Sequence, residues 1–168
     1  MLAQLWVAEN IAFGIIALIM VVGAIRVVTT RNIVHAALYL VLVLAGVAAQ
    51  YILLAAEFVA ITQVLVYIGA IVVLFLFGIM LTRAPMGAMH DTDNEQRLVG
   101  AAISVILLGI MGYTLWKAFG HKQFTNLTVQ TTQQVSNTIF STYLIPFEVV
   151  SVLLLAALIG AIVLARRD

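Results

Sequence analysis

Long hydrophobic runs dominate the chain, and short polar stretches separate them. Five of these runs are long enough to cross a bilayer, because a hydrocarbon core of about 30 Å requires about 20 residues of α-helix. They cover approximately residues 11–28, 33–54, 58–81, 98–119 and 146–165. Backbone groups in lipid must satisfy their hydrogen bonds within the segment, so the runs are predicted to be helices and not strands.

The amino-acid composition supports a membrane location. Hydrophobic residues make up 64% of the chain and charged residues only 9%, whereas soluble domains carry about 25% charged residues. We therefore predict an all-α integral membrane bundle that forms one domain over residues 1–168. The first run has no basic segment before it and no small-residue cleavage site after it, so we expect a retained helix and no cleaved signal peptide.

The connections between the runs differ in how clearly they are marked. A polar "TTRN" turn follows the first run, and a segment rich in Thr, Gln and Asn at residues 120–145 is predicted to be a long outer loop. The stretch "AQYILLAAE" between the second and third runs contains no Pro, Gly or basic residue. This boundary is therefore the least well defined in the sequence.

The distribution of Lys and Arg predicts the orientation in the membrane, because cytoplasmic loops carry an excess of these residues. The first loop, the third loop and the C-terminus share one side, and they contain Arg26, Arg31, Arg83, Arg97, Arg166 and Arg167. Only Lys117 and Lys122 fall on the other side. The prediction is an outer N-terminus and a cytoplasmic C-terminus, and the compartment expected is the inner (plasma) membrane of a bacterium.

Several kinds of chemistry lack the residues they require. The chain has no cysteine, which excludes disulfides, thiolate-held iron–sulfur clusters and thiol nucleophiles. Only His35 lies in an apolar run, so a bis-histidine haem cannot come from this chain alone. His90 with Asp91, Asp93 and Glu95 is more typical of a solvated acidic loop than of a calcium or zinc site. We expect no catalytic centre, no cofactor-binding site and no metal site on this chain.

Two carboxylates at the starts of apolar runs are candidate proton-path residues. Glu57 precedes the third run and Glu148 lies at the start of the fifth. Ionisable residues within membrane spans commonly mark functional sites, but a helix N-terminus also favours a negative charge. Both interpretations, a proton-path group and a simple helix-start charge, stay open for each residue.

The third run also contains polar groups that a straight helix does not align. Gln63 and Tyr67 are about 40° apart on an α-helix, whereas Glu57 lies about 120° from Gln63. Either Glu57 faces another partner or the helix changes pitch. Gly69 follows closely, and a π-bulge there would rotate the residues beyond it. The alternative is that Gly69 packs against a neighbouring helix.

Small residues recur at spacings that allow close helix packing in lipid. The pairs are Ala45 with Ala49, Gly100 with Ser104, and Ala156 with Gly160. The alternative is that Ala and Gly are simply frequent in this chain.

Four stretches, in this order along the chain, resemble one family. They are "RNIVHAALYL", "AEFVAITQ", "VYIGAIVVLFLFGIML" and "PFEVVSVLLLAALIGAIVLA". All four resemble the chain 6/J subunit of NADH–quinone oxidoreductase, the respiratory complex I. The third of them, residues 66–81, is similar to the signature helix of that family, and the resemblance covers the chain except for its long loops.

The resemblance implies a role in a larger assembly. It implies a subunit without a redox centre, packed among the quinone-site subunit, antiporter-like subunits and other hydrophobic subunits of the membrane arm. NADH, FMN, iron–sulfur clusters and quinone would belong to the assembly. In the family the third helix can form a π-bulge, here at Tyr67, Ile68 and Gly69, which is proposed to control a water path between quinone chemistry and proton pumping.

Two positions depart from the family pattern. Some relatives have a glutamate where this chain has Gln63, so the resemblance implies that Gln63 is a possible proton-path position that is neutral here. Many relatives have a proline where this chain has Ile33. On the basis of the resemblance we predict a membrane-arm subunit that couples quinone reduction to proton transfer. Alternatives are a subunit of a related cation/proton antiporter or membrane-bound hydrogenase, or a passive scaffold subunit. A self-contained channel or transporter is the least favoured interpretation.

Overall fold

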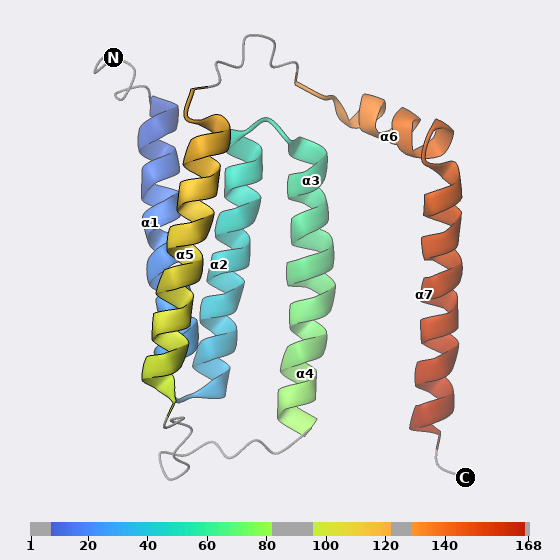
Figure 1. Cartoon of the computed structure of the whole chain (residues 1–168). Helices are drawn as coiled ribbons and strands as arrows, with labels where there is room; N and C mark the ends of the chain where they lie inside the picture. The colour runs from blue at the N-terminus through green and yellow to red at the C-terminus, as the bar shows by residue number, and fades with distance from the viewer. Residues whose placement is uncertain (1–7, 82–95, 122–128, 167–168) are drawn as a thin grey trace.

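The computed structural model describes residues 8–81, 96–121 and 129–166, and Figure 1 shows the arrangement of the helices. The first two membrane spans are α1 (Ala8–Thr29) and α2 (Ile33–Leu53), and the fourth and fifth are α5 (Arg97–Phe119) and α7 (Leu144–Ala165). The third span is composite, with α3 (Glu57–Thr62), the π-helix η2 (Gln63–Val72) and α4 (Val73–Leu81). A shorter helix, α6 (Thr132–Ser141), precedes α7.

The prediction of an all-α fold with five membrane spans is confirmed, since five helices are long and apolar enough to cross a membrane. The spans begin at or up to three residues before the hydrophobic runs, because a first helical turn accepts polar residues such as Glu9. Pro146 lies in the first turn of α7, where a missing N–H removes no helical hydrogen bond. Asn32 caps α2 by accepting hydrogen bonds from the backbone N–H groups of Val34 and His35.

The first two spans pack closely against each other through glycine. A Cβ atom built on Gly46 of α2 would lie 2.4 Å from Cγ of Met20 in α1. A Cβ on Gly23 of α1 would lie 3.0 Å from Cγ2 of Val43 in α2. Both glycines therefore allow a neighbouring side chain to approach the helix backbone, which is a common way of packing helices in lipid.

The third span packs on α2, so α1, α2 and the third span form a layer with α2 in the middle (Figure 1). Its buried residues are Ala60 in α3 and Gln63 and Val72 in η2. On α2 the buried residues are Ala37 and Ala48. Apart from Gln63, the buried side chains of these helices are thus small, and they are few.

The turn between α2 and α3 uses an alanine where glycine is usual. Ala55 has a φ of 55°, a left-handed conformation that most residues avoid. Its N–H donates to the carbonyl of Ile52, and the N–H of Ala56 donates to the carbonyl of Tyr51. This is the Schellman arrangement of helix ends, in which the left-handed position is usually glycine. The exception explains why the sequence contains no clear turn signal here.

The segment predicted as a long loop at residues 120–145 contains α6, so that prediction was wrong for residues 132–141. Thr131 and Gln134 form a reciprocal capping box that starts the helix. The ring of Phe140 meets that of Phe147 in α7 edge-on, with centroids 5.1 Å apart. These local contacts stabilise a helix that the Thr- and Gln-rich composition conceals. The predicted acidic loop with His90 and Asp91 lies outside the described residues.

The remaining two spans lie apart from this layer. Neither α5 nor α7 has a buried residue. Within the described chain, α7 approaches only α6, and α5 approaches no other helix closely. A Cβ on Gly100 or Gly160 would meet no atom within 4 Å, so the predicted small-residue pairs on these helices join no helices of the described chain. Most of the surface of both spans is uncovered.

Candidate functional site in the third membrane span

The change of pitch begins at Gln63, and the sequence around it weakens an α-helix. Just before it, the hydroxyl of Thr62 donates to the carbonyl of Phe58, a contact that competes with the helical hydrogen bonds and often bends a helix. The segment "QVLVYIGAIV" then combines β-branched residues with Gly69, and both kinds of residue lower helix propensity. A π-helix of ten residues follows, and it contains Tyr67, Ile68 and Gly69.

Gln63 is the one buried polar residue among the described residues, with 7% of its surface exposed. The described structure contains no side-chain hydrogen bond from its amide. Tyr67, predicted to share a face with Gln63, is 49% exposed. The two side chains therefore differ in their surroundings.

Gly69 has no close contact with another helix of the described chain. A Cβ built on it would lie 3.4 Å from the carbonyl oxygen of Val64 and within 4 Å of no atom of another described helix. Val64 is on the same π-helix, five residues earlier. Packing against a neighbouring helix, the alternative given by the sequence, is therefore not what Gly69 does within the described chain. Its nearest neighbour is the backbone of its own π-helix.

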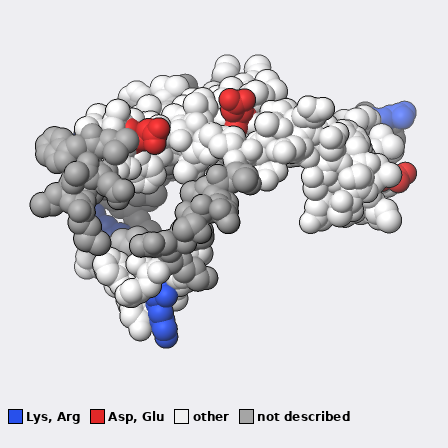
Figure 2. All heavy atoms as spheres, turned by 90° about the horizontal axis from the view of Figure 1, so that it is seen from above, with Lys and Arg blue, Asp and Glu red and all other residues white. Residues whose placement is uncertain are grey.

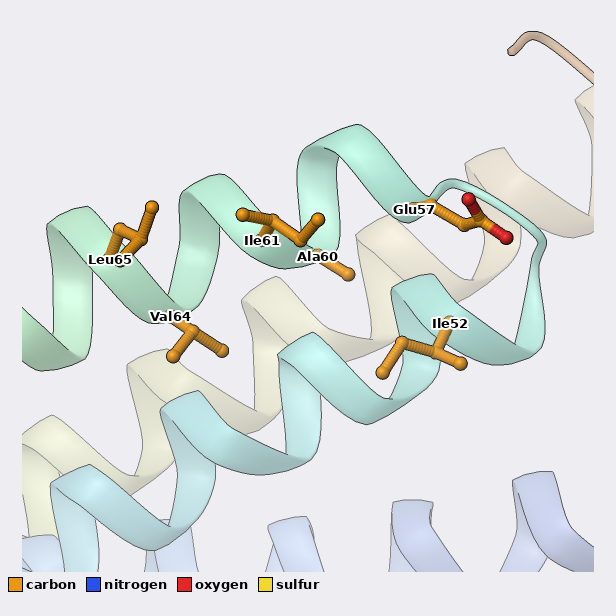
Figure 3. A pocket seen from close by; sticks show the side chains of 6 residues that line it. All are labelled: Ile52, Glu57, Ala60, Ile61, Val64 and Leu65. Atoms are coloured by element: carbon orange, nitrogen blue, oxygen red, sulfur yellow. The ribbon is translucent and has the colours of Figure 1, made fainter. Parts of the chain in front are cut away.

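Glu57 is exposed at the start of α3 and lines a groove of about 470 Å³. The other lining residues are Ile52, Ala60, Ile61, Val64 and Leu65 (Figure 3). Glu148 lines a separate hollow of about 320 Å³ on α7. Its neighbours there are Ile145, Val149 and Val152.

The structure does not bring the two candidate carboxylates together. Glu57 belongs to the third span, and α7, which carries Glu148, has no close approach to that span. Seen from above, the described acidic side chains form separate patches on a mostly uncharged surface (Figure 2). Of the candidate residues, Gln63 and the Tyr67–Gly69 step share one π-helix. Their functional roles stay predictions.

The sequence analysis missed a polar contact between the first two spans. The side-chain Nε2 of Gln50 in α2 donates to the backbone carbonyl of Phe13 in α1, at 3.3 Å. Its Oε1 is buried and has no hydrogen-bond partner among the described atoms. The signal available in the sequence was an amide within an apolar run, since such groups commonly hydrogen-bond across helices in lipid.

These features define the chain as a multi-pass membrane protein whose helical surface is mostly left uncovered. Large exposed apolar surfaces are typical of contacts with lipid or with other proteins. Residues 23–164 match the family of NADH-ubiquinone/plastoquinone oxidoreductase chain 6. The chain belongs to this family of complex I-type subunits, as the resemblance of its four motifs predicted.

Three relatives illustrate the extent of the similarity. The chain is 38% identical to F(420)H(2) dehydrogenase subunit J of Methanosarcina mazei, over 95% of this chain and 92% of that protein. It is 40% identical to NAD(P)H-quinone oxidoreductase chain 6 of Synechocystis, over 95% and 82% of the two chains. It is also 40% identical to the chloroplastic NAD(P)H-quinone oxidoreductase subunit 6 of Chara vulgaris, over 97% and 91%.

Proposed function

We propose that this chain is a membrane-arm subunit, without a redox centre, of a proton-translocating NADH:quinone oxidoreductase. In this role the third span couples quinone reduction to proton transfer. The observation that carries the proposal is the π-helix η2, which begins at the buried amide of Gln63 within a membrane span. π-Helical segments are rare and are frequently found at functional sites.

The coupling would work through a change of helical pitch. Loss of one extra residue from a π-helical segment rotates the part of the helix beyond it by about 100°. Such a rotation would move Tyr67 relative to Gln63, which is held against α2. The amide of Gln63 does not titrate, so its role would be to hydrogen-bond water in one of the two states. Glu57 and Glu148 are the carboxylates of this chain proposed for contact with the proton path.

The uncovered surfaces of α5 and α7 support partners in the membrane. We propose that these are hydrophobic membrane-arm subunits, among them the quinone-site subunit and antiporter-like subunits. NADH, FMN, iron–sulfur clusters and quinone would act on those and other subunits. The proposed location is a bacterial plasma membrane. The Lys and Arg distribution supports an N-terminus outside and a C-terminus in the cytoplasm.

The test of this proposal is the substitution Gly69→Leu in the intact assembly. Glycine is less favourable in an α-helix than ordinary residues by about 1 kcal/mol, and we expect leucine to favour the α form of this segment over the π form. A Cβ at this position has space, so we expect normal assembly. Proton translocation per quinone reduced should fall in proteoliposomes, and NADH–quinone turnover should change with it.

The matched control is Gly78→Leu in α4. Gly78 is on the same span but outside η2, and a Cβ there would meet no atom within 4 Å. We expect it to leave coupling unchanged. Normal assembly with normal coupled pumping in Gly69→Leu would contradict the proposal and favour a passive scaffold. Replacement of Gln63 by Leu gives a second measurement, because it removes the amide without adding charge and should reduce coupling without reducing assembly.

A further inference from the structure

The groove beside Glu57 is an open, largely apolar hollow with one polar end. Ala60, at 3% exposure, provides a small floor, and Ile52 of α2 lies across from it. Figure 3 shows Val64 directed toward α2 and Glu57 at the end nearest the α2–α3 turn. Glu57 is the one charged residue in the lining. The groove is therefore apolar along its length and has a carboxylate at one end.

Its length matches one leaflet of a bilayer. The third span has 25 residues, about 37 Å of helix, which exceeds a hydrocarbon core of about 30 Å. Glu57, as the first residue of that span, therefore lies near the headgroup level. From Glu57 to Leu65 the helix rises by about 12 Å, most of the roughly 15 Å depth of a single leaflet. A partner helix that crossed the membrane would need a surface along the whole span, whereas this groove ends within one half of it.

We infer that this groove binds one phospholipid with a primary-amine headgroup, of the phosphatidylethanolamine class. One acyl chain lies along Ala60 and Val64, and the headgroup ammonium lies at the Glu57 carboxylate. A primary ammonium has three N–H donors and forms charge-assisted hydrogen bonds with a carboxylate. A quaternary choline headgroup has no N–H donor, and an anionic headgroup is repelled. The site therefore selects the amine among lipids with equal acyl chains.

The experiment uses the intact assembly in nanodiscs that contain equal amounts of phosphatidylethanolamine and phosphatidylcholine. Each lipid in turn carries a photoactivatable diazirine on an identical acyl chain, and cross-linked peptides are mapped by mass spectrometry. We expect cross-links on residues 52–65, with the ethanolamine lipid favoured several-fold. Glu57→Gln should remove this preference. Since Glu57 is exposed and the change preserves side-chain size, we expect it to leave assembly intact.

A second variant tests the groove itself. Ile52→Trp places a large ring in the hollow from a position that is 64% exposed, and it should lower the cross-linking of both lipids at residues 52–65. Its control, Leu74→Trp, changes a residue that is 73% exposed on α4, away from the groove. That variant should cross-link like the unmodified protein.

Two results would overturn the inference. Equal cross-linking of both lipids with no response to Glu57→Gln would mean general contact with the bilayer and no headgroup site. Cross-links from residues 52–65 to another subunit, with none to lipid, would show that a protein fills the groove. The inference does not depend on proton coupling, so it can hold whether or not Gly69→Leu uncouples the assembly.

Discussion

The α1–α2 pair and the third span are both apolar and similar in length, but they are built in different ways. Within the pair, Gly23 and Gly46 receive side chains of the other helix, and Gln50 bonds to the opposite backbone. Gly69 of the third span receives no side chain of another helix within the described chain and lies in a π-helix. Glycine thus lies at a contact between two helices in one region and within a π-helix in the other.

We expect this difference to separate a rigid helix pair from a span that can change its pitch. A contact that fills the space above a glycine must be broken before either helix can rotate, so α1 and α2 are expected to move as a unit. Rotation within the third span need only rearrange its own backbone hydrogen bonds and the contact with α2. Whether a glycine touches another helix therefore indicates its structural role better than its mere presence in a span does.

The largest expected effect is at Gly46. In Gly46→Leu the new Cβ would lie 2.4 Å from Cγ of Met20, so Met20 must move or the helices must separate. Overpacking of this kind typically costs about 1–3 kcal/mol. We expect a lower midpoint for thermal dissociation of the solubilised assembly. Gly14→Leu on α1, where a Cβ meets no atom within 4 Å, is the control, and equal midpoints for the two variants would contradict the close packing at Gly46.

A smaller effect of opposite sign is expected at the turn that joins the regions. Ala55 has a positive φ, which costs an alanine about 1–2 kcal/mol relative to a residue without Cβ. Ala55→Gly should therefore raise the thermal midpoint. The gain in stability should be somewhat smaller than the strain that is removed, because glycine also gains entropy in the unfolded chain. Ala56→Gly provides the control, because Ala56 has a φ of −95°. That variant should be neutral or destabilising, and a gain in both would contradict the strain at Ala55.

The smallest effect is expected at Gln50. Gln50→Leu loses the 3.3 Å bond to the Phe13 carbonyl but also removes the buried Oε1 that has no partner in the described structure. Interhelical hydrogen bonds in membranes average about 0.6 kcal/mol, so the net change in thermal midpoint should be slight. Gln50→Glu, which cannot donate to the carbonyl and adds a charge, should be clearly worse. A large loss in Gln50→Leu would show that Oε1 has a partner in the assembly.

The five spans could be predicted from the sequence because membrane thickness sets a minimum length for an apolar run. Their packing could not. The buried positions on α2 are Ala37 and Ala48, yet Ala45 of the same helix is exposed, and lipid and protein present similar apolar surfaces. Periodicity is therefore a weak guide to which face is covered.

The missed local structure has specific physical reasons. Ala55 ends α2 in a conformation that normally marks glycine, so the turn carried no signal. The start of α6 depends on the reciprocal bonds of Thr131 and Gln134, a pattern hidden in a Thr- and Gln-rich segment. For the candidate site, the sequence indicated a break in pitch near Gly69, but the length of the π-helix depends on backbone bonding along the whole segment. The separation of Glu57 from Glu148 follows from the position of α7, which no local pattern specifies.

The placement of α7 bears on how the chain is assembled. Helix α6 connects to α7 through the Phe140–Phe147 contact and also approaches α3, while α7 itself has no close contact with the first three spans. If neighbouring subunits occupy the space on either side of α7, they are bordered by two parts of one continuous polypeptide. This chain then contacts those neighbours on two sides, so both parts of it must separate from them before it can exchange by lateral diffusion. The neighbouring subunits would have to be in place before α7 closes on them. The turnover of this chain would then follow that of the whole assembly.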